Sequence, residues 1–450
     1  MEIDKLVVVS GDSHAVPHPD SIPDYVESQF HELLPGVYED NEQFARLFGS
    51  FANFGPEILE VIDADGVWAS GGVTGAWDVD RRLAEMDREG VAAELIFPGD
   101  ARAILPLTPM LRHYPQDVVA GGVRAYHRWL ADRAGAAPAR LLPVGDPGSA
   151  VDLDAMLAEL TWTADHGFVA AQLPNPRERD LPPLHDRFWD RYWAQAVDLG
   201  LAIALHAGYG GAQCEFIDQI NAIKRTMEAA GRTDLLHEIL NTEGFFSLDL
   251  RPRRAMWQLM LGGVFDRHPD LRLYLAEIRA DWVPATLRHL DAAFERARTD
   301  VPATRRPSEY WQDRCLTSLS FVHRAEVGMR HEIGIDNVLF GRDFPHAEGT
   351  WPNTADWLTD AFQGVPEPEL RLVLGENAIR FFGLDPVPLR EVAARVGPTV
   401  GQVTGRVPDA APALVAHWDA RGGYLKPMEQ VDTGAIDALL TEDLEALTVV

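Results

Sequence analysis

Eight short apolar segments recur along the chain, and a helical pattern follows most of them. They span residues 6–9, 92–97, 141–144, 168–173, 201–205, 271–276, 316–321 and 337–340. Segments that are apolar on both faces fit parallel strands buried on both sides of a sheet. Repeated strand–helix units predict an α/β fold, and eight of them favour a closed (β/α)8 TIM barrel. Periodicity alone is also compatible with an open sheet.

Two long segments interrupt this rhythm, at residues 18–74 and 207–254. Both are rich in large apolar side chains, and we expect the second to be mostly helical. Such insertions serve either as lids over a pocket or as contacts between subunits. We therefore expect one barrel domain over residues 1–385, followed by a C-terminal extension at 386–450. The extension is expected to pack on the barrel or on a neighbouring subunit, in a homodimer or higher homo-oligomer.

The charge balance limits the partners of the chain. It has 69 acidic and 40 basic residues, a formal net charge of −29. Such a surface repels nucleic acid and anionic membranes, so we expect neither as a partner. No apolar run approaches the roughly 18 residues that cross a membrane, and the first residues lack a signal-peptide pattern. Two cysteines cannot build a disulfide framework. We expect a cytoplasmic protein that acts on a small molecule.

Polar residues stand where several of the predicted strands end. They are Asp12 and His14 after the first strand, His206 on the fifth, Glu277 on the sixth, and Asp343 and His346 after the eighth. The active site of a barrel forms at the C-terminal ends of its strands. Taken singly, each residue has a structural explanation, such as a turn, a buried hydrogen bond or a helix cap. Together, carboxylates and imidazoles at one end predict a divalent metal site for zinc, manganese or iron.

The segment at residues 339–352, Leu-Phe-Gly-Arg-Asp-Phe-Pro-His-Ala-Glu-Gly-Thr-Trp-Pro, carries a family resemblance. It resembles the eighth-strand signature of amidohydrolase-related proteins, in the branch that contains aminocarboxymuconate-semialdehyde decarboxylase and related aromatic-acid decarboxylases. Similarly typical segments lie at residues 86–91, 263–273, 276–277, 282–284 and 375–378. The resemblance covers about residues 6–384. It implies four metal ligands, which are Asp12, His14, His206 and Asp343.

The chain departs from this branch at two places, and from the dinuclear members of the superfamily at a third. Members usually have His or Glu where Asp12 stands, a change that keeps the ligand chemistry. The decarboxylases have a histidine where this chain has Glu277, which argues against decarboxylation. The fourth strand, Val169–Leu173, contains no lysine that could bridge two metals after modification.

The charges of the site bear on the number of ions. Its six candidate ligands are three carboxylates and three neutral imidazoles, so one divalent ion leaves a net −1 and two leave +1. A buried excess of negative charge is costly unless a second ion or a proton neutralises it. Glu277 or His346 would hold a second ion, although His346 could instead anchor its loop. We therefore expect one or two divalent ions per chain.

The default prediction for such a site is hydrolysis of a carbonyl substrate by metal-activated water. Asp343 would be a ligand and proton acceptor, His206 would help to bind the carbonyl or the water, and Glu277 would carry a proton to the leaving group. The alternatives are a dinuclear iron or manganese oxygenase, a non-oxidative decarboxylase and an inactive metal-binding subunit.

Two arginines flank the predicted ligands. Arg279 and Arg342 could each bind a substrate carboxylate through two hydrogen bonds. The alternative for both is an ion pair with an acidic residue of the protein itself.

Overall fold

The computed structural model describes most of the chain. The described residues are 5–39, 42, 60–99, 114–176, 181–207, 225, 245–320, 322–346, 349–405, 410–421 and 433–448. Most of the predicted insertion at 207–254 lies outside them, and so does part of the insertion at 18–74. The prediction that residues 207–254 are mostly helical can be compared with the structure mainly at residues 245–254, which belong to a helix.

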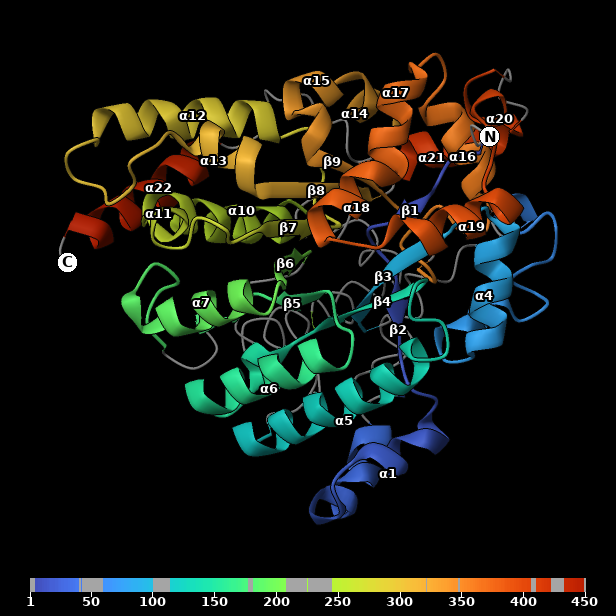
Figure 1. Ribbon diagram of the computed structural model, residues 1–450, viewed down its shortest axis with the longest axis horizontal. Helices are drawn as coiled ribbons and strands as arrows, with labels where there is room; N and C mark the ends of the chain where they lie inside the picture. The colour runs from blue at the N-terminus through green and yellow to red at the C-terminus, as the bar shows by residue number, and fades with distance from the viewer. Residues whose placement is uncertain are drawn as a thin grey trace.

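The strands form one parallel sheet at the centre of the molecule (Figure 1). They are β1 (Val9–Ser10), β2 (His14–Ala15), β3 (Ala93–Pro98), β4 (Leu141–Gly145), β5 (Ala170–Gln172), β6 (Ala202–His206), β7 (Leu273–Ala276), β8 (Cys315–Ser320) and β9 (Val338–Gly341). Both β1 and β2 pair with β3, so together they correspond to the first predicted strand. From β3 to β9 each strand pairs with the next in the sequence, and every pairing is parallel.

Hydrogen bonds join the last strand to the first. The amide of Gly11 donates to Phe340 O at 2.8 Å, and the amide of Asp343 donates to Asp12 O at 2.9 Å. These contacts bring the two edges of the sheet together. The result is a nearly closed eight-stranded parallel barrel with additional helices, which confirms the predicted (β/α)8 fold.

Helices surround the strands on the outside (Figure 1). The helices of eight or more residues before residue 386 are α4 (Val79–Arg88), α5 (Gln116–Ala134), α6 (Leu153–Asp165), α7 (Asp190–Asp198), α10 (Phe245–Leu261), α12 (Val283–Arg296), α13 (Pro307–Arg314) and α16 (Thr354–Ala361). Shorter ones are α1 (Ile22–Tyr25), α11 (Val264–Arg267), α14 (Arg324–Gly328), α15 (Arg330–Ile333), α17 (Glu367–Arg371) and α18 (Asn377–Phe382). Side-chain caps define the starts of α4 and α6, because Asp78 accepts from Arg81 N and Asp152 accepts from Ala155 N.

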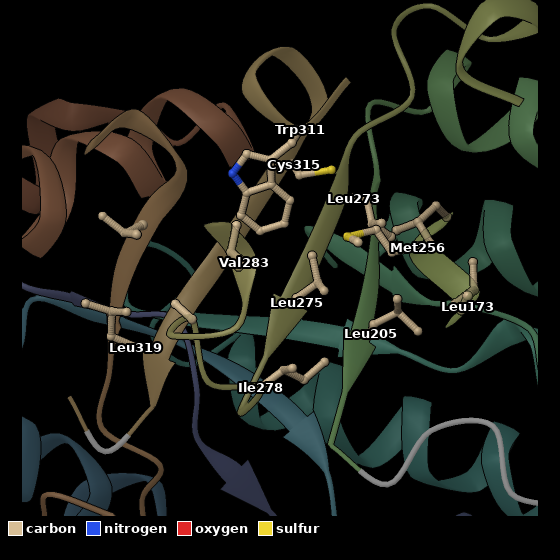
Figure 2. Close-up of a cluster of buried hydrophobic side chains, with 14 of the residues drawn as sticks. Leu173, Leu205, Met256, Leu273, Leu275, Ile278, Val283, Trp311, Cys315 and Leu319 are labelled. Carbon is tan, nitrogen blue, oxygen red and sulfur yellow. The ribbon is translucent and has the colours of Figure 1, made fainter. Parts of the chain in front are cut away.

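Alternate residues of the strands pack on opposite faces of the barrel wall. Ala202 and Ala204 of β6 belong to the cluster inside the barrel, where their small side chains leave room for Tyr274. Their neighbours Ile203 and Leu205 belong to the larger cluster between strands and helices. In Figure 2 that outer cluster includes Leu205, Leu273 and Leu275 of the strands beside Met256 of α10 and Trp311 of α13. Successive side chains of a strand point to opposite faces, so each strand contributes apolar residues both to the inside of the barrel and to the layer under the helices.

In the part of the chain after residue 385 that the structure describes, four more helices follow: α19 (Pro386–Val396), α20 (Val400–Thr404), α21 (Pro412–Arg421) and α22 (Thr433–Thr448). Trp418 of α21 stacks on Trp357 of α16 with ring centroids 4.9 Å apart. Asp443 of α22 accepts hydrogen bonds from Arg254, Trp257 and Gln258 of α10. The described part of the C-terminal extension thus contacts the helical layer of the same chain. The division at residue 385 and the oligomeric state stay predictions.

Within the described residues, the search for a helix with both the length and the hydropathy of a membrane span finds none.

Candidate metal centre

The structure brings all six predicted ligands to one end of the barrel. Asp12 lies between β1 and β2, and His14 begins β2. His206 is the last residue of β6 and pairs in register with Ala276, so Glu277 directly follows β7 beside it. Asp343 and His346 come just after β9. Parallel strands place these residues at the same end because their C-termini all point that way.

The donor atoms lie close enough to share a cation. His14 Nε2 is 3.3 Å from Asp343 Oδ1 and 3.7 Å from Asp12 Oδ1. His206 Nε2 is 3.4 Å from both Asp12 Oδ1 and Glu277 Oε2. His346 Nδ1 is 2.9 Å from Asp343 Oδ1. Ligand atoms about 2.0–2.2 Å from one ion can be separated by up to about 4.4 Å, so these spacings fit coordination.

The donors form two groups that share one histidine. Asp12, His14, His206 and Glu277 offer atoms that all lie within 4.8 Å of one another, and so do His14, Asp343 and His346. Three carboxylates and three imidazoles, without a thiolate, are a donor set suited to manganese, iron or zinc. The residues present therefore fit a divalent ion by chemistry and by spacing.

The electrostatics of the site favour a cation. Burial by itself lowers the pKa of His206, but the Asp12 and Glu277 carboxylates beside it outweigh burial and raise that pKa to about 9. Burial and the nearby Asp343 carboxylate raise the pKa of Glu277 well above its usual value. Both shifts express the same excess of buried negative charge, which a proton or a metal ion can neutralise.

Two site residues have an unusual backbone conformation. Glu277 and Asp343 both have φ = 53°, and among the described residues they are the only ones other than glycine with positive φ. This left-handed region is costly for a residue with a Cβ and persists only where the surroundings hold it. The amide of Asp343 donates to Asp12 O, and the amide of Glu277 donates to Ser318 Oγ at 3.3 Å. The turn after each strand directs its carboxylate into the site.

The two arginines differ from each other. Arg342 is fully buried, with Nη2 2.7 Å from Glu94 Oε2 and Nη1 3.6 Å from Glu89 Oε2. Its guanidinium pairs with the protein's own carboxylates, so the expected role in substrate binding does not fit its position. Arg279 follows Glu277 by two residues, and its partly exposed side chain lies 3.8 Å from Asp281. It stays a candidate for the substrate carboxylate.

Sequence reasoning missed three residues next to the site. The ring of Phe97, at the end of β3, lies 4.9 Å from the ring of His206 and 6.3 Å from that of His14. Arg82 and Glu94 lie buried beneath the ligand-bearing segments. The sequence could have indicated Phe97, because it ends the predicted strand at residues 92–97 and so lies at the same end of the barrel as the candidate ligands. A charged residue inside an apolar strand was the signal for Glu94.

Comparisons with known proteins identify the family of the chain. Residues 29–384 match the Amidohydro_2 family, Amidohydrolase. Two curated relatives are gamma-resorcylate decarboxylases. The one from Rhodococcus jostii (strain RHA1) is 32% identical over 135 residues, which cover 28% of this chain and 39% of the relative. The one from Rhizobium sp. (strain MTP-10005) is 28% identical over 132 residues. The matched part spans about two fifths of the curated relatives' length.

Solved structures match over a longer stretch. The 5-carboxyvanillate decarboxylase of Sphingomonas paucimobilis aligns with a TM-score of 0.54 and 21% identity, over 84% of this chain and 99% of that one. A 5-carboxyvanillate decarboxylase of Novosphingobium aromaticivorans, with bound manganese and 3-methoxy-4-hydroxy-5-nitrobenzoic acid, aligns with a TM-score of 0.60 and 16% identity, over 85% and 98%. At these identities the likeness shows the fold alone.

These relatives correct the expected chemistry. The site alone favoured hydrolysis by metal-activated water, but both curated relatives named above are decarboxylases, so the prediction of a hydrolase is wrong. Hydrolases and decarboxylases of this fold can use the same kinds of ligand, and the ligand set therefore did not discriminate between them. The chain belongs to the Amidohydro_2 family, and the curated relatives named above are decarboxylases.

Proposed function

We propose that this protein is a metal-dependent, non-oxidative decarboxylase of a small aromatic acid. The observation that carries the proposal is the convergence of the six donor side chains at the strand ends, in a chain whose curated relatives are decarboxylases. The 2,6-dihydroxybenzoate bound in one structural neighbour indicates the class of substrate, a hydroxylated benzoic acid.

Asp12, His14, His206 and Asp343 would hold the ion, and manganese is the first candidate because a structural neighbour contains it. When bound, a divalent ion supplies positive charge that orients and polarises the oxygen atoms of the substrate. Glu277 and His346 add donors that the four ligands do not need. The proposal therefore includes a second ion at these two residues. Metal analysis of purified protein would give the number of ions per chain.

The reaction requires a proton at one ring carbon. The ring carbon that bears the carboxylate accepts this proton. The bond between this ring carbon and the carboxylate carbon then breaks, and its electron pair returns to the ring as carbon dioxide leaves. We assign delivery of this proton to the Asp343 carboxyl group, which the left-handed turn after β9 holds inside the site and which would receive its proton from the neighbouring Glu277. Glu277 takes the place of the decarboxylases' histidine and retains a proton readily, because burial and Asp343 raise its pKa. His206 lies between Asp12 and Glu277 and keeps both carboxylates oriented.

The remaining neighbours suit an aromatic acid. Phe97 presents an apolar ring beside the imidazoles of His14 and His206. Arg279 offers a guanidinium on the same turn as Glu277 and can pair with the anionic group of the substrate. An apolar wall and one cation would hold the ring and its charge in a defined orientation.

The test is anaerobic turnover of hydroxybenzoic acids by protein loaded with Mn²⁺. We expect equimolar carbon dioxide and decarboxylated phenol from a panel that includes 2,6-dihydroxybenzoate and 5-carboxyvanillate. Turnover should stop after chelation and return with added Mn²⁺. Asp343→Asn keeps the size of the side chain and tolerates the left-handed conformation, so we expect it to fold and to lose about 100-fold or more in kcat. Folded, metal-loaded protein that releases no carbon dioxide, or turnover that needs oxygen, would refute the proposal.

A further inference from the structure

A buried ion-pair network lies beneath the segments that carry the predicted metal ligands. Its centre is Glu94 of β3, which is fully buried. One carboxylate oxygen accepts from Arg82 Nε at 2.5 Å, and the other accepts from Arg342 Nη2 at 2.7 Å. Burial alone raises the pKa of Glu94, but Arg342 and Arg82 lower it below its usual value, so the carboxylate is ionised. The proposed reaction uses none of these three residues.

Arg82 connects Glu94 to the first metal-binding segment. From α4, its Nη1 donates to the backbone oxygen of His14 at 2.8 Å, and its Nη2 donates to Ser13 Oγ at 2.8 Å. A guanidinium can hold several acceptors at fixed angles because its donors form a rigid fork. Arg82 therefore fixes the backbone of His14, and with it the direction from which the imidazole enters the site.

Arg342 connects Glu94 to the last metal-binding segment. It directly precedes Asp343, and its amide donates to Ser10 Oγ at 2.8 Å. The Ser10 hydroxyl in turn donates to Asp12 O at 2.7 Å. The turn that carries Asp343 is thus held on one side by the first strand and on the other by the Glu94 ion pair.

Both guanidinium groups also lie against one ring. The Cζ atoms of Arg82 and Arg342 are 5.1 Å and 4.8 Å from the centroid of Phe344, which is itself fully buried. Phe344 follows Asp343, so this contact restrains the same turn from another direction.

We propose that Glu94 is a positioning residue that sets the metal affinity of the site, through Arg82 to His14 and through Arg342 to Asp343. The inference rests on the proposed metal site. Residues that hold metal ligands in place without touching the metal typically change metal affinity by about 10–100-fold when they are removed, because the ligands lose their orientation. A purely structural ion pair would lower stability and leave the affinity of the folded site unchanged.

The test compares Glu94→Gln with Glu159→Gln. Glu159 is a buried carboxylate of α6 that pairs with His127 and Arg128 of α5, and it serves as a matched control because neither partner is a predicted metal ligand. Mn²⁺ affinity of metal-free protein is measured by calorimetry and by the EPR signal of free Mn²⁺, and melting temperature is measured on the same samples. We expect both variants to melt lower. Glu94→Gln should bind Mn²⁺ about tenfold or more weakly, and Glu159→Gln should stay within about twofold of wild type.

Arg82→Lys is the second variant, and it decides the matter if Glu94→Gln does not fold. Lysine keeps the charge but cannot hold Glu94, Ser13 and His14 together, so Mn²⁺ affinity should again fall. Wild-type affinity in the folded variants, or an equal loss in Glu159→Gln, would overturn this inference and leave the proposed function standing. Wild-type protein that binds no Mn²⁺ would overturn both.

Discussion

At the scale of single residues, the site depends on two carboxylates in left-handed backbone. Glu277 and Asp343 sit at equivalent points, directly after β7 and shortly after β9, and share φ = 53°. A left-handed residue with a Cβ costs about 1–2 kcal/mol. Aspartate enters this region more readily than glutamate, so the strain is concentrated at Glu277. Strain that persists at a predicted catalytic group is consistent with a functional demand on it.

The strain at Glu277 gives a prediction with a built-in control. Glu277→Gln and Glu277→Asn both remove the ionisable carboxyl group, but only asparagine tolerates the left-handed region. We expect both variants to lose most of their turnover. In the metal-free state, Glu277→Asn should be more stable than Glu277→Gln by about 1 kcal/mol, measured by urea unfolding. An asparagine variant less stable than the glutamine variant would show that packing, and not the backbone, dominates at this position.

At the scale of elements, α5 and α6 are joined by one buried carboxylate. His127 Nε2 accepts from the amide of Asp146 at 2.8 Å, so its Nδ1 is free to donate to Glu159 Oε1 at 2.7 Å. Arg128 Nη2 donates to the other oxygen at 3.2 Å. Burial raises the pKa of Glu159, but the hydrogen bonds from His127 and Arg128 outweigh it and lower the pKa to about 2.

This depressed pKa predicts a stability that depends on acidity. Because the folded pKa of about 2 lies below the value of 4.5 expected in the unfolded chain, Glu159 stabilises the protein above pH 4.5. That contribution is lost as the pH falls toward 2. Glu159→Gln should be about 2 kcal/mol less stable at pH 7, after allowance for partial exposure. The difference in melting temperature between wild type and variant should shrink from pH 5 downward. A constant difference over this range would contradict the assignment.

At the scale of the whole molecule, a buried carboxylate joins the last helix to the helical layer of the barrel. Asp443 of α22 accepts from Arg254 Nε at 3.0 Å, Trp257 Nε1 at 2.7 Å and Gln258 Nε2 at 2.9 Å, all on α10. The side chain is almost completely buried. In the chain, α10 is followed by α11 and then by β7, the strand that precedes Glu277. The contact therefore connects α22 to the part of the chain that leads into the site.

Asp443→Asn tests that contact. Asparagine removes the charge and replaces one of the two acceptor oxygens by an NH2 donor, so Arg254, Trp257 and Gln258 can no longer all be satisfied. We expect a loss of about 2–3 kcal/mol in the free energy of unfolding. Asp437 on the same helix is the control, because it is largely exposed where it pairs with His289 at 2.7 Å. Asp437→Asn should cost less than about 0.5 kcal/mol. Equal losses in both variants would mean that helix propensity, rather than the buried contact, governs this part of the molecule.

Periodicity and strand-end chemistry made the barrel predictable, together with the convergence of the candidate ligands at one end of it. Each apolar strand carries its own signal within a few residues, and parallel strands necessarily end at one face. Asp12 and Asp343 could therefore be placed together although 331 residues separate them. The reaction type was not predictable in this way, because the same donors serve hydrolysis, oxygenation and decarboxylation.

What only the tertiary structure decided concerns side chains whose partners lie far away in the sequence. The neighbouring residues in the sequence do not show whether Arg342 binds a substrate or pairs with the protein's own carboxylates. Its ion pair with Glu94 forms only because the closed barrel brings the end of β9 close to β3. The left-handed turns at Glu277 and Asp343 have no glycine to announce them. Local sequence encodes secondary structure because the backbone responds to its immediate neighbours. Burial, charge pairing and strain are set by contacts that exist only once the barrel has closed.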